Sequence, residues 1–83
     1  MARLYFDLHE CGDITIDEEG QEVADLATAR MLAVRSARDI IRADVLDGRL
    51  CLQGVIVVRE PGGKTVMTLA FGDAVAVTPA MAA

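Results

Sequence analysis

Residues 26–46, LATARMLAVRSARDIIRADVL, carry the longest helical spacing of apolar residues in the chain. At about 100° per residue, these apolar side chains fall in one broad arc, which is typical of a helix that packs on a core. The arc comprises Leu26, Ala29, Ala33, Val34, Ala37, Ile40, Ile41 and Val45. Asp25 precedes the pattern as an N-cap, and Gly48 follows it where a left-handed C-terminal cap belongs. The pattern predicts one long helix, and its small alanines predict a close approach to a sheet.

The segment ahead of the helix is predicted to form a β-hairpin. Residues 3–9, RLYFDLH, alternate between apolar and polar side chains, and residues 13–17 alternate again. The short ECG sequence between them is able to close a two-stranded turn. Because alternate strand residues face opposite sides, we expect Ile14 and Ile16 to face the core.

The segment after the helix is predicted to form a second hairpin. Residues 50–59 are apolar on both faces, which favours a strand covered on both sides. The PGG sequence at residues 61–63 indicates a turn, and residues 64–71 supply the last strand. Residues 72–77 are expected to continue as a bent strand.

The order of these elements predicts an α+β fold of the ββαββ type. We expect a four-stranded, mostly antiparallel sheet with the long helix across one face. The strand order 2-1-3-4 keeps every neighbour antiparallel, whereas the alternative order, 2-1-4-3, needs one parallel pair. Residues 1–78 are expected to form a single domain, with residues 79–83 as a frayed C-terminal tail.

Composition bounds the class of protein and its compartment. A hydrophobic fraction of 53% excludes a disordered chain, and no apolar run approaches the roughly 18 to 20 residues that cross a bilayer. Residues 1–8 lack the apolar region of a secretion signal, so we expect a cytoplasmic protein. Cytoplasmic thiols stay reduced, which predicts that Cys11 and Cys51 are free; a disulfide is the alternative in an oxidising compartment.

Two clusters of polar residues are candidates for a catalytic or metal site. DEEGQEVADL, residues 17–26, holds five carboxylates, but its spacing does not match a calcium loop, and a turn followed by a helix start accounts for it. His9 and Cys11 form the sole conventional pair of base and nucleophile, and no third residue orients them. We therefore predict no catalytic residue, no metal site and no cofactor.

Two surfaces are predicted to contact partners. Tyr5, Val55, Val57 and Val66 are expected to form an apolar patch on the sheet face opposite the helix. This patch predicts a two-fold homodimer that uses this sheet face or an open sheet edge, unless residues 73–77 fold back over the patch. Arg35, Arg38 and Arg42 are spaced to form a basic ridge on the helix. A solvated helix surface is the first interpretation of this ridge, and an unidentified acidic protein partner is the alternative. The net charge of −5 disfavours nucleic acid, and no membrane binding is expected.

The order of several short motifs resembles a family of small bacterial proteins known only as a domain of unknown function. The motifs are RLYFDLHECGD, DEEGQEVADL, GRLCLQGVIVVRE and TVMTLAFGDAV, from Arg3 to about Val77. The residues most similar to the family are Tyr5, Phe6, Asp7, Leu8, Asp17, Glu18, Glu19, Gly20, Asp25, Leu26, Phe71, Asp73, Ala74 and Val75. The resemblance implies the same ββαββ domain and brings no catalytic residue, cofactor or partner.

The sequence favours a small cytoplasmic module for protein interaction or regulation, without catalysis. The alternative is a small enzyme or ligand-binding domain that uses Cys11 and His9, or a pocket that the sequence does not reveal.

Overall fold

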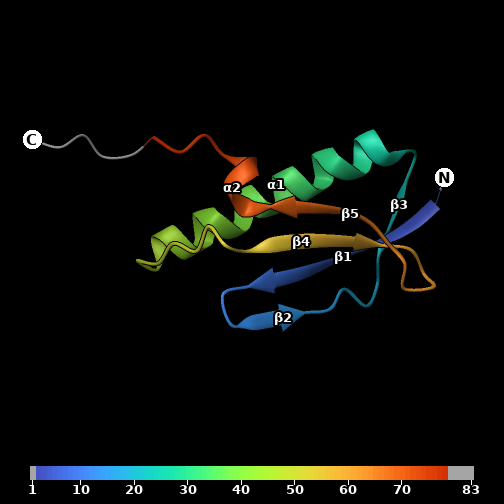
Figure 1. The fold of residues 1–83 in the computed structure, drawn as a ribbon, viewed down its shortest axis with the longest axis horizontal. Coiled ribbons are helices and arrows are strands. Elements are labelled where there is room, and N and C mark those ends of the chain that lie inside the picture. Colours follow the sequence, from blue (N-terminus) through green and yellow to red (C-terminus); the bar gives the residue numbers. More distant parts are fainter. Residues whose placement is uncertain (1, 79–83) are drawn as a thin grey trace, which may run out of the picture.

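A computed structural model describes residues 2–78 of the chain, which fold as one antiparallel sheet with a long helix along it (Figure 1). The elements are β1 (Ala2–Glu10), β2 (Asp13–Thr15), β3 (Gln21–Val23), α1 (Leu26–Leu46), β4 (Val55–Arg59), β5 (Thr65–Ala70) and α2 (Phe71–Ala74). None of the helices among the described residues is long and apolar enough to cross a membrane. The frayed tail predicted for residues 79–83 lies outside the described residues.

The sheet has the order β2-β1-β4-β5, and β3 also pairs with β1. The α+β class, the antiparallel sheet and the single long helix are confirmed, but the predicted count of four strands is wrong and the order differs in detail. One edge of β1 is shared by two short strands, with Leu8 opposite Thr15 at one end and Ala2 opposite Val23 at the other. The fifth strand arises because the turn after β2 brings the chain back alongside the start of β1.

Helix α1 has the predicted bounds because both of its ends are capped locally. The carboxylate of Asp25 accepts a hydrogen bond at 2.7 Å from a first-turn amide. At the other end, Gly48 has φ 80°, its amide donates to the carbonyl of Val45 at 2.9 Å, and the amide of Arg49 donates to that of Asp44 at 2.8 Å. These two bonds form a Schellman motif, which satisfies carbonyls that the helix leaves unpaired.

The centre of the inner face of α1 is made of alanines, and the partly buried Leu32, Ile40 and Ile41 also pack against the core. Ala29, Ala33 and Ala37 are completely buried, and they belong to the same core cluster as the sheet residues Ile56 and Val58. The predicted arc is too long, because its end members Leu26 and Val45 are each 54% exposed. Only the middle turns of α1 are therefore covered by the sheet and α2.

The chain on either side of the second hairpin departs from the predicted strands. The strand predicted over residues 50–59 begins only at Val55, and residues 71–74 form α2 in place of a bent strand. The ring of Phe71 is completely buried and packs directly against Gly54. A Cβ atom at Gly54 would lie only 2.8 Å from this ring. The amide of Phe71 also donates to the carbonyl of Gly54 at 2.8 Å. This contact lies just before the start of β4 and just after the end of β5.

Ile14 and Ile16 do not face the core, so that prediction is wrong. They are 64% and 53% exposed. Ile14 lies opposite His9, and His9 lies opposite Val55, which places Ile14 on the face that points away from α1. The helix-facing side carries the alternate residues of β4, which include the buried Ile56.

Gly20 is predicted to be the glycine least tolerant of alanine in the first half of the chain. It has φ 71°, and a Cβ there would approach the carbonyl oxygen of Leu4 to 2.9 Å. We expect Gly20→Ala to lower the free energy of unfolding by about 3 kcal/mol, from the left-handed backbone and the clash together. Gly63→Ala is the matched control, since Gly63 has φ 97° with nothing within 4 Å of its Cβ position, and should cost only about 1 kcal/mol. Urea denaturation of both variants measures the difference, and equal losses would contradict the clash.

Candidate functional site

A buried ion pair lies on the sheet face away from α1. Asp7 is only 4% exposed, and its carboxylate accepts a hydrogen bond from Arg59 Nε at 2.6 Å. That hydrogen bond is the main reason that the pKa of Arg59 lies above its ordinary value. The guanidinium of Arg59 also lies 4.6 Å from the centre of the Tyr5 ring, a favourable contact between a cation and an aromatic face. Tyr5 is therefore already in contact with a residue of its own chain.

Asp17 ties the acidic turn to this ion pair. Its amide donates to Asp7 at 2.9 Å, and its carboxylate accepts from the amide of Phe6 at 3.1 Å. The same carboxylate also accepts from the amides of Glu19 at 3.1 Å and Gly20 at 3.0 Å, which closes the predicted turn. We call Asp7, Asp17 and Arg59 the acidic clasp. Both oxygens of each carboxylate accept hydrogen bonds from donors of the same chain, which suits the carboxylates to holding the fold together.

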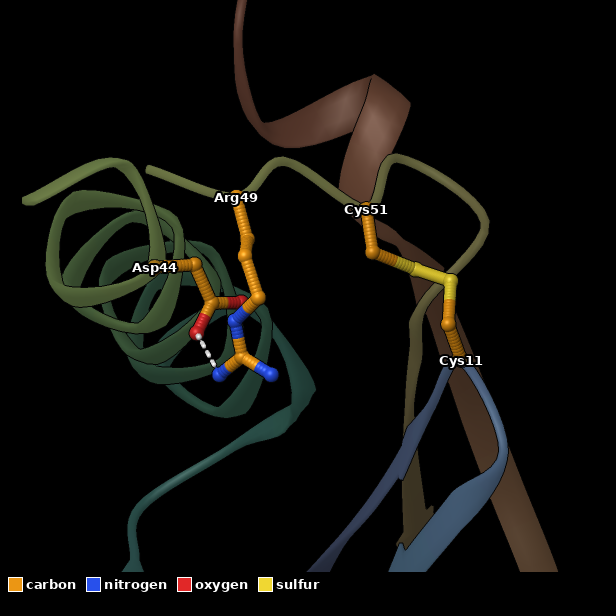
Figure 2. The surroundings of a disulfide bond; sticks show 4 residues. All are labelled: Cys11, Asp44, Arg49 and Cys51. Atoms are coloured by element: carbon orange, nitrogen blue, oxygen red, sulfur yellow. Dashed lines mark ion pairs between the residues drawn. A yellow bond between two sulfur atoms is a disulfide. The ribbon is translucent and has the colours of Figure 1, made fainter. Parts of the chain in front are cut away.

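A disulfide joins Cys11, in the turn between β1 and β2, to Cys51, in the loop after α1 (Figure 2). Their Cα atoms lie 6.2 Å apart, within the range of disulfides. The prediction of two free thiols is wrong for this form of the protein. In this form Cys11 carries no thiolate, so the pair formed with His9 has no nucleophile.

An open cavity of about 290 Å³ lies beside the disulfide. Its lining residues are Glu10, Cys11, Asp13, Asp44, Arg49, Leu50 and Cys51. A hydrogen bond with Asp44, together with burial, raises the pKa of Glu10 above its ordinary value. Arg49 lies 3.8 Å from the Asp44 carboxylate, as Figure 2 shows. Within residues 2–78, no group of three or more histidine, cysteine or carboxylate side chains is arranged to hold a metal ion.

The predicted apolar patch is present in part on the open sheet face. Val55 and Val57 are half-buried there. The exposed Ile14, which was predicted to face the core, lies in the same row as Val55. Val66 is partly buried and packs against the core cluster, so it adds little to this patch. The strand register places Ile14 on the sheet face away from α1. The alternation of residues in a three-residue strand does not reveal its register.

The predicted basic ridge is divided by its contacts. Arg38 donates from Nε to the carbonyl of Ala74 in α2 at 2.6 Å, so its stem is held in place. Arg35 and Arg42 are exposed, and among the described residues neither forms an ion pair. Sequence reasoning missed Arg30 and Met31, which share a groove on α1 with Arg35 and Arg38. The signal available for Met31 was its place outside the apolar arc, which predicts an exposed apolar residue.

A family model for a domain of unknown function, DUF6894, matches residues 3–72. The chain belongs to this family. No curated protein and no solved structure matches the chain. In this DUF6894 domain the motif residues Asp7 and Asp17 meet in the acidic clasp, and Gly20 provides the backbone that the turn requires. These three residues of the resemblance thus have a structural explanation.

The acidic clasp predicts a loss of stability in acid. Burial raises the pKa of Asp17, but the amide bonds from Gly20, Phe6 and Glu19 outweigh it, and the net pKa lies below the ordinary value. The stabilisation is therefore complete above the aspartate pKa of the unfolded chain, about 3.9, and disappears as the pH falls through the lower folded pKa.

We expect Asp17→Asn to lower the free energy of unfolding by about 1 to 3 kcal/mol near neutral pH, because amide bonds to a charged acceptor are lost. The difference from the wild type should shrink at about pH 2.5, because this carboxylate is then protonated in the unfolded chain and part of the stabilisation is lost. Urea denaturation at both pH values measures it, with the exposed neighbour change Glu18→Gln as the control. A difference that stays constant with pH would show that the charge of Asp17 is not the cause.

The disulfide predicts a protein whose thiols are blocked and whose stability depends on oxidation. Cys11 and Cys51 are separated by 40 positions, and closing a loop of that length stabilises a fold by about 3 to 4 kcal/mol. We expect Cys51→Ser, or reduction of the wild type, to lower the free energy of unfolding by about this amount. Alkylation followed by mass spectrometry should find both thiols protected in oxidised protein. Identical stability with and without reductant would contradict the bond.

Proposed function

We propose that this DUF6894 domain is a protein-interaction or regulatory module without catalytic activity, and that it acts as a two-fold homodimer. The observation that carries the proposal is the sheet face away from α1, where the exposed Ile14 and the half-buried Val55 lie in one row with His9 between them. Ile14, His9, Val55 and Ala70 lie opposite one another in turn across four strands. Ile14 is 64% exposed, which leaves the outer end of this row without cover.

The size of the face supports association. Complete burial of Ile14, Val55 and Val57 contributes at most about 1.5 kcal/mol for each side chain. The sum is comparable with the roughly 3 to 5 kcal/mol that a single core of this size supplies. A two-fold contact uses the same surface twice, so one patch is sufficient.

The course of the C-terminal segment favours a sheet face that is free for a partner. The alternative is that residues 73–77 cover this face. The side chain of Phe71 is completely buried in the core cluster, and α2 packs against α1. The chain therefore leaves β5 on the helix side of the sheet, away from Val55 and Val57.

The absence of catalysis is supported by the state of the reactive groups. The carboxylates of Asp7 and Asp17 are occupied by internal donors, and Cys11 is bonded to Cys51. The competing proposal is a small enzyme that uses Cys11 and His9, and it requires the reduced protein. The test is the rate at which iodoacetamide alkylates Cys11 in the reduced protein, measured against pH. A profile that follows an ordinary thiol, with a pKa of about 8.5, would count against the enzyme. Rapid reaction near pH 6 would count against the module.

We retain the cytoplasm of a bacterium as the proposed compartment. The disulfide is the argument against it, because reducing systems keep most cytoplasmic cysteines as thiols. In that compartment the pair Cys11 and Cys51 is expected to be a dithiol except under oxidation. Alkylation at the moment of cell lysis shows whether Cys11 and Cys51 are a dithiol or a disulfide in the cell. A fully oxidised pair would overturn the cytoplasmic proposal.

The dimer is tested by light scattering coupled to size exclusion. At micromolar concentration we expect a species of twice the 8.9 kDa chain mass, and Val57→Lys should convert it to a monomer, because a lysine ammonium cannot be buried in an apolar contact without a partner. Leu46→Lys is the matched control, since Leu46 is 78% exposed at the end of α1. Circular dichroism checks that both variants keep the fold. A wild-type monomer that persists on tenfold concentration would refute the dimer.

A further inference from the structure

A groove of about 580 Å³ runs along the exposed side of α1, away from the sheet-face patch. It is lined by Ala27, Arg30, Met31, Val34, Arg35, Arg38 and Asp39. All of these residues come from one helix, so the groove is a strip about 18 Å long on the helix surface. It does not involve the disulfide or the acidic clasp.

The floor of the groove is apolar. Met31 is 71% exposed, which is unusual for a large apolar side chain, and Ala27 beside it is exposed as well. Val34 is half-buried and contributes its outer side to the same strip. The spacing of Ala27, Met31 and Val34 is four and then three residues, which places them in line and matches the ridges of a second packed helix. Methionine suits such a surface because its flexible thioether adapts to different partners.

The rim of the groove is basic. Arg30, Arg35 and Arg38 stand against the single carboxylate of Asp39, so the strip carries a net charge of 3 − 1 = +2 in a chain of net charge −5. Among the described residues, neither Arg30 nor Arg35 forms an ion pair. Both guanidinium groups therefore remain available to a partner.

Arg38 is held ready for a partner. Its Nε donates to the carbonyl of Ala74 at 2.6 Å, and this bond leaves the two terminal nitrogens for an external acceptor. An ordered guanidinium loses less conformational freedom on binding than a free one. The short helix α2 thereby gives α1 one preorganised cation.

We propose that this groove binds an acidic amphipathic helix of another protein, with apolar side chains on Met31 and Val34 and carboxylates on Arg30, Arg35 and Arg38. A nucleic acid fits less well. Three cations neutralise few phosphates and so release few counterions, and phosphates gain nothing from contact with apolar side chains. A second copy of α1 fits less well, because arginines would then face arginines. The proposal is independent of the homodimer on the sheet face.

Fluorescence polarisation with a defined probe tests the proposal. The probe is a labelled synthetic peptide of about 18 residues, with leucine at helical spacing on one face and glutamate elsewhere. We expect saturable binding that weakens with salt, and Arg35→Gln or Met31→Lys should weaken it about tenfold. Arg42→Gln is the matched control, an arginine on the same helix outside the groove, and should leave binding unchanged. Circular dichroism confirms that each variant is folded.

Each remaining outcome overturns the assignment. No binding, or equal binding of a peptide with lysine in place of glutamate, would remove the charge complementarity. An equal loss for Arg42→Gln would mean that the net charge of the helix acts in place of the groove. Tighter binding of a short DNA duplex than of the acidic peptide would make the strip a phosphate surface. The Val57→Lys variant should bind the peptide as the wild type does, whatever its oligomeric state, and a loss there would tie the groove to the dimer.

Discussion

The buried ion pair between Asp7 and Arg59 is the constraint on which the N-terminal half of the fold depends. A carboxylate that is 4% exposed is costly without a cation, and removing the partner of such a pair typically costs about 3 to 5 kcal/mol. A slip of β1 by one residue would turn Asp7 toward α1 and the alanine face. The pair therefore fixes the register of β1 against β4, and the amide of Asp17 extends the constraint to the acidic turn.

The acidic turn shows how far local chemistry determines structure. Residues 17–20 form the predicted turn because the Asp17 carboxylate accepts the amides that follow it. Asp25 also caps α1 as predicted, but Glu22 lies 3.2 Å from Arg3 across the sheet and belongs to β3. A strand of three residues has no alternation of its own to detect, so its existence depends on its neighbour β1.

Elsewhere too, features set by neighbouring residues in the sequence could be predicted, and features set by contacts between distant segments could not. The bounds of α1 could be predicted because both caps lie within a few residues of the helix ends. The face of Ile14 could not, because it depends on pairing with His9 and, through it, Val55. The disulfide could not either, since it joins positions 40 residues apart and only the folded chain brings the β1–β2 turn to the loop after α1. Of the candidate surfaces, the valines of β4 and the groove residues Arg35 and Arg38 were predicted from their spacing, whereas Arg30 and the apolar floor of the α1 groove were not.

The alanines of α1 connect the core to both proposed surfaces. Because Ala29, Ala33 and Ala37 are small, the helix backbone lies close to the sheet and uses few large side chains on its inner face. The core is then supplied mainly by the sheet and Phe71, which leaves Met31 directed to solvent. Leu32, Ile40 and Ile41 pack partly buried against this core, whereas Met31 stays free for a second surface. The arginines beside Met31 keep that surface soluble in the absence of a partner and give it a charge that discriminates between partners.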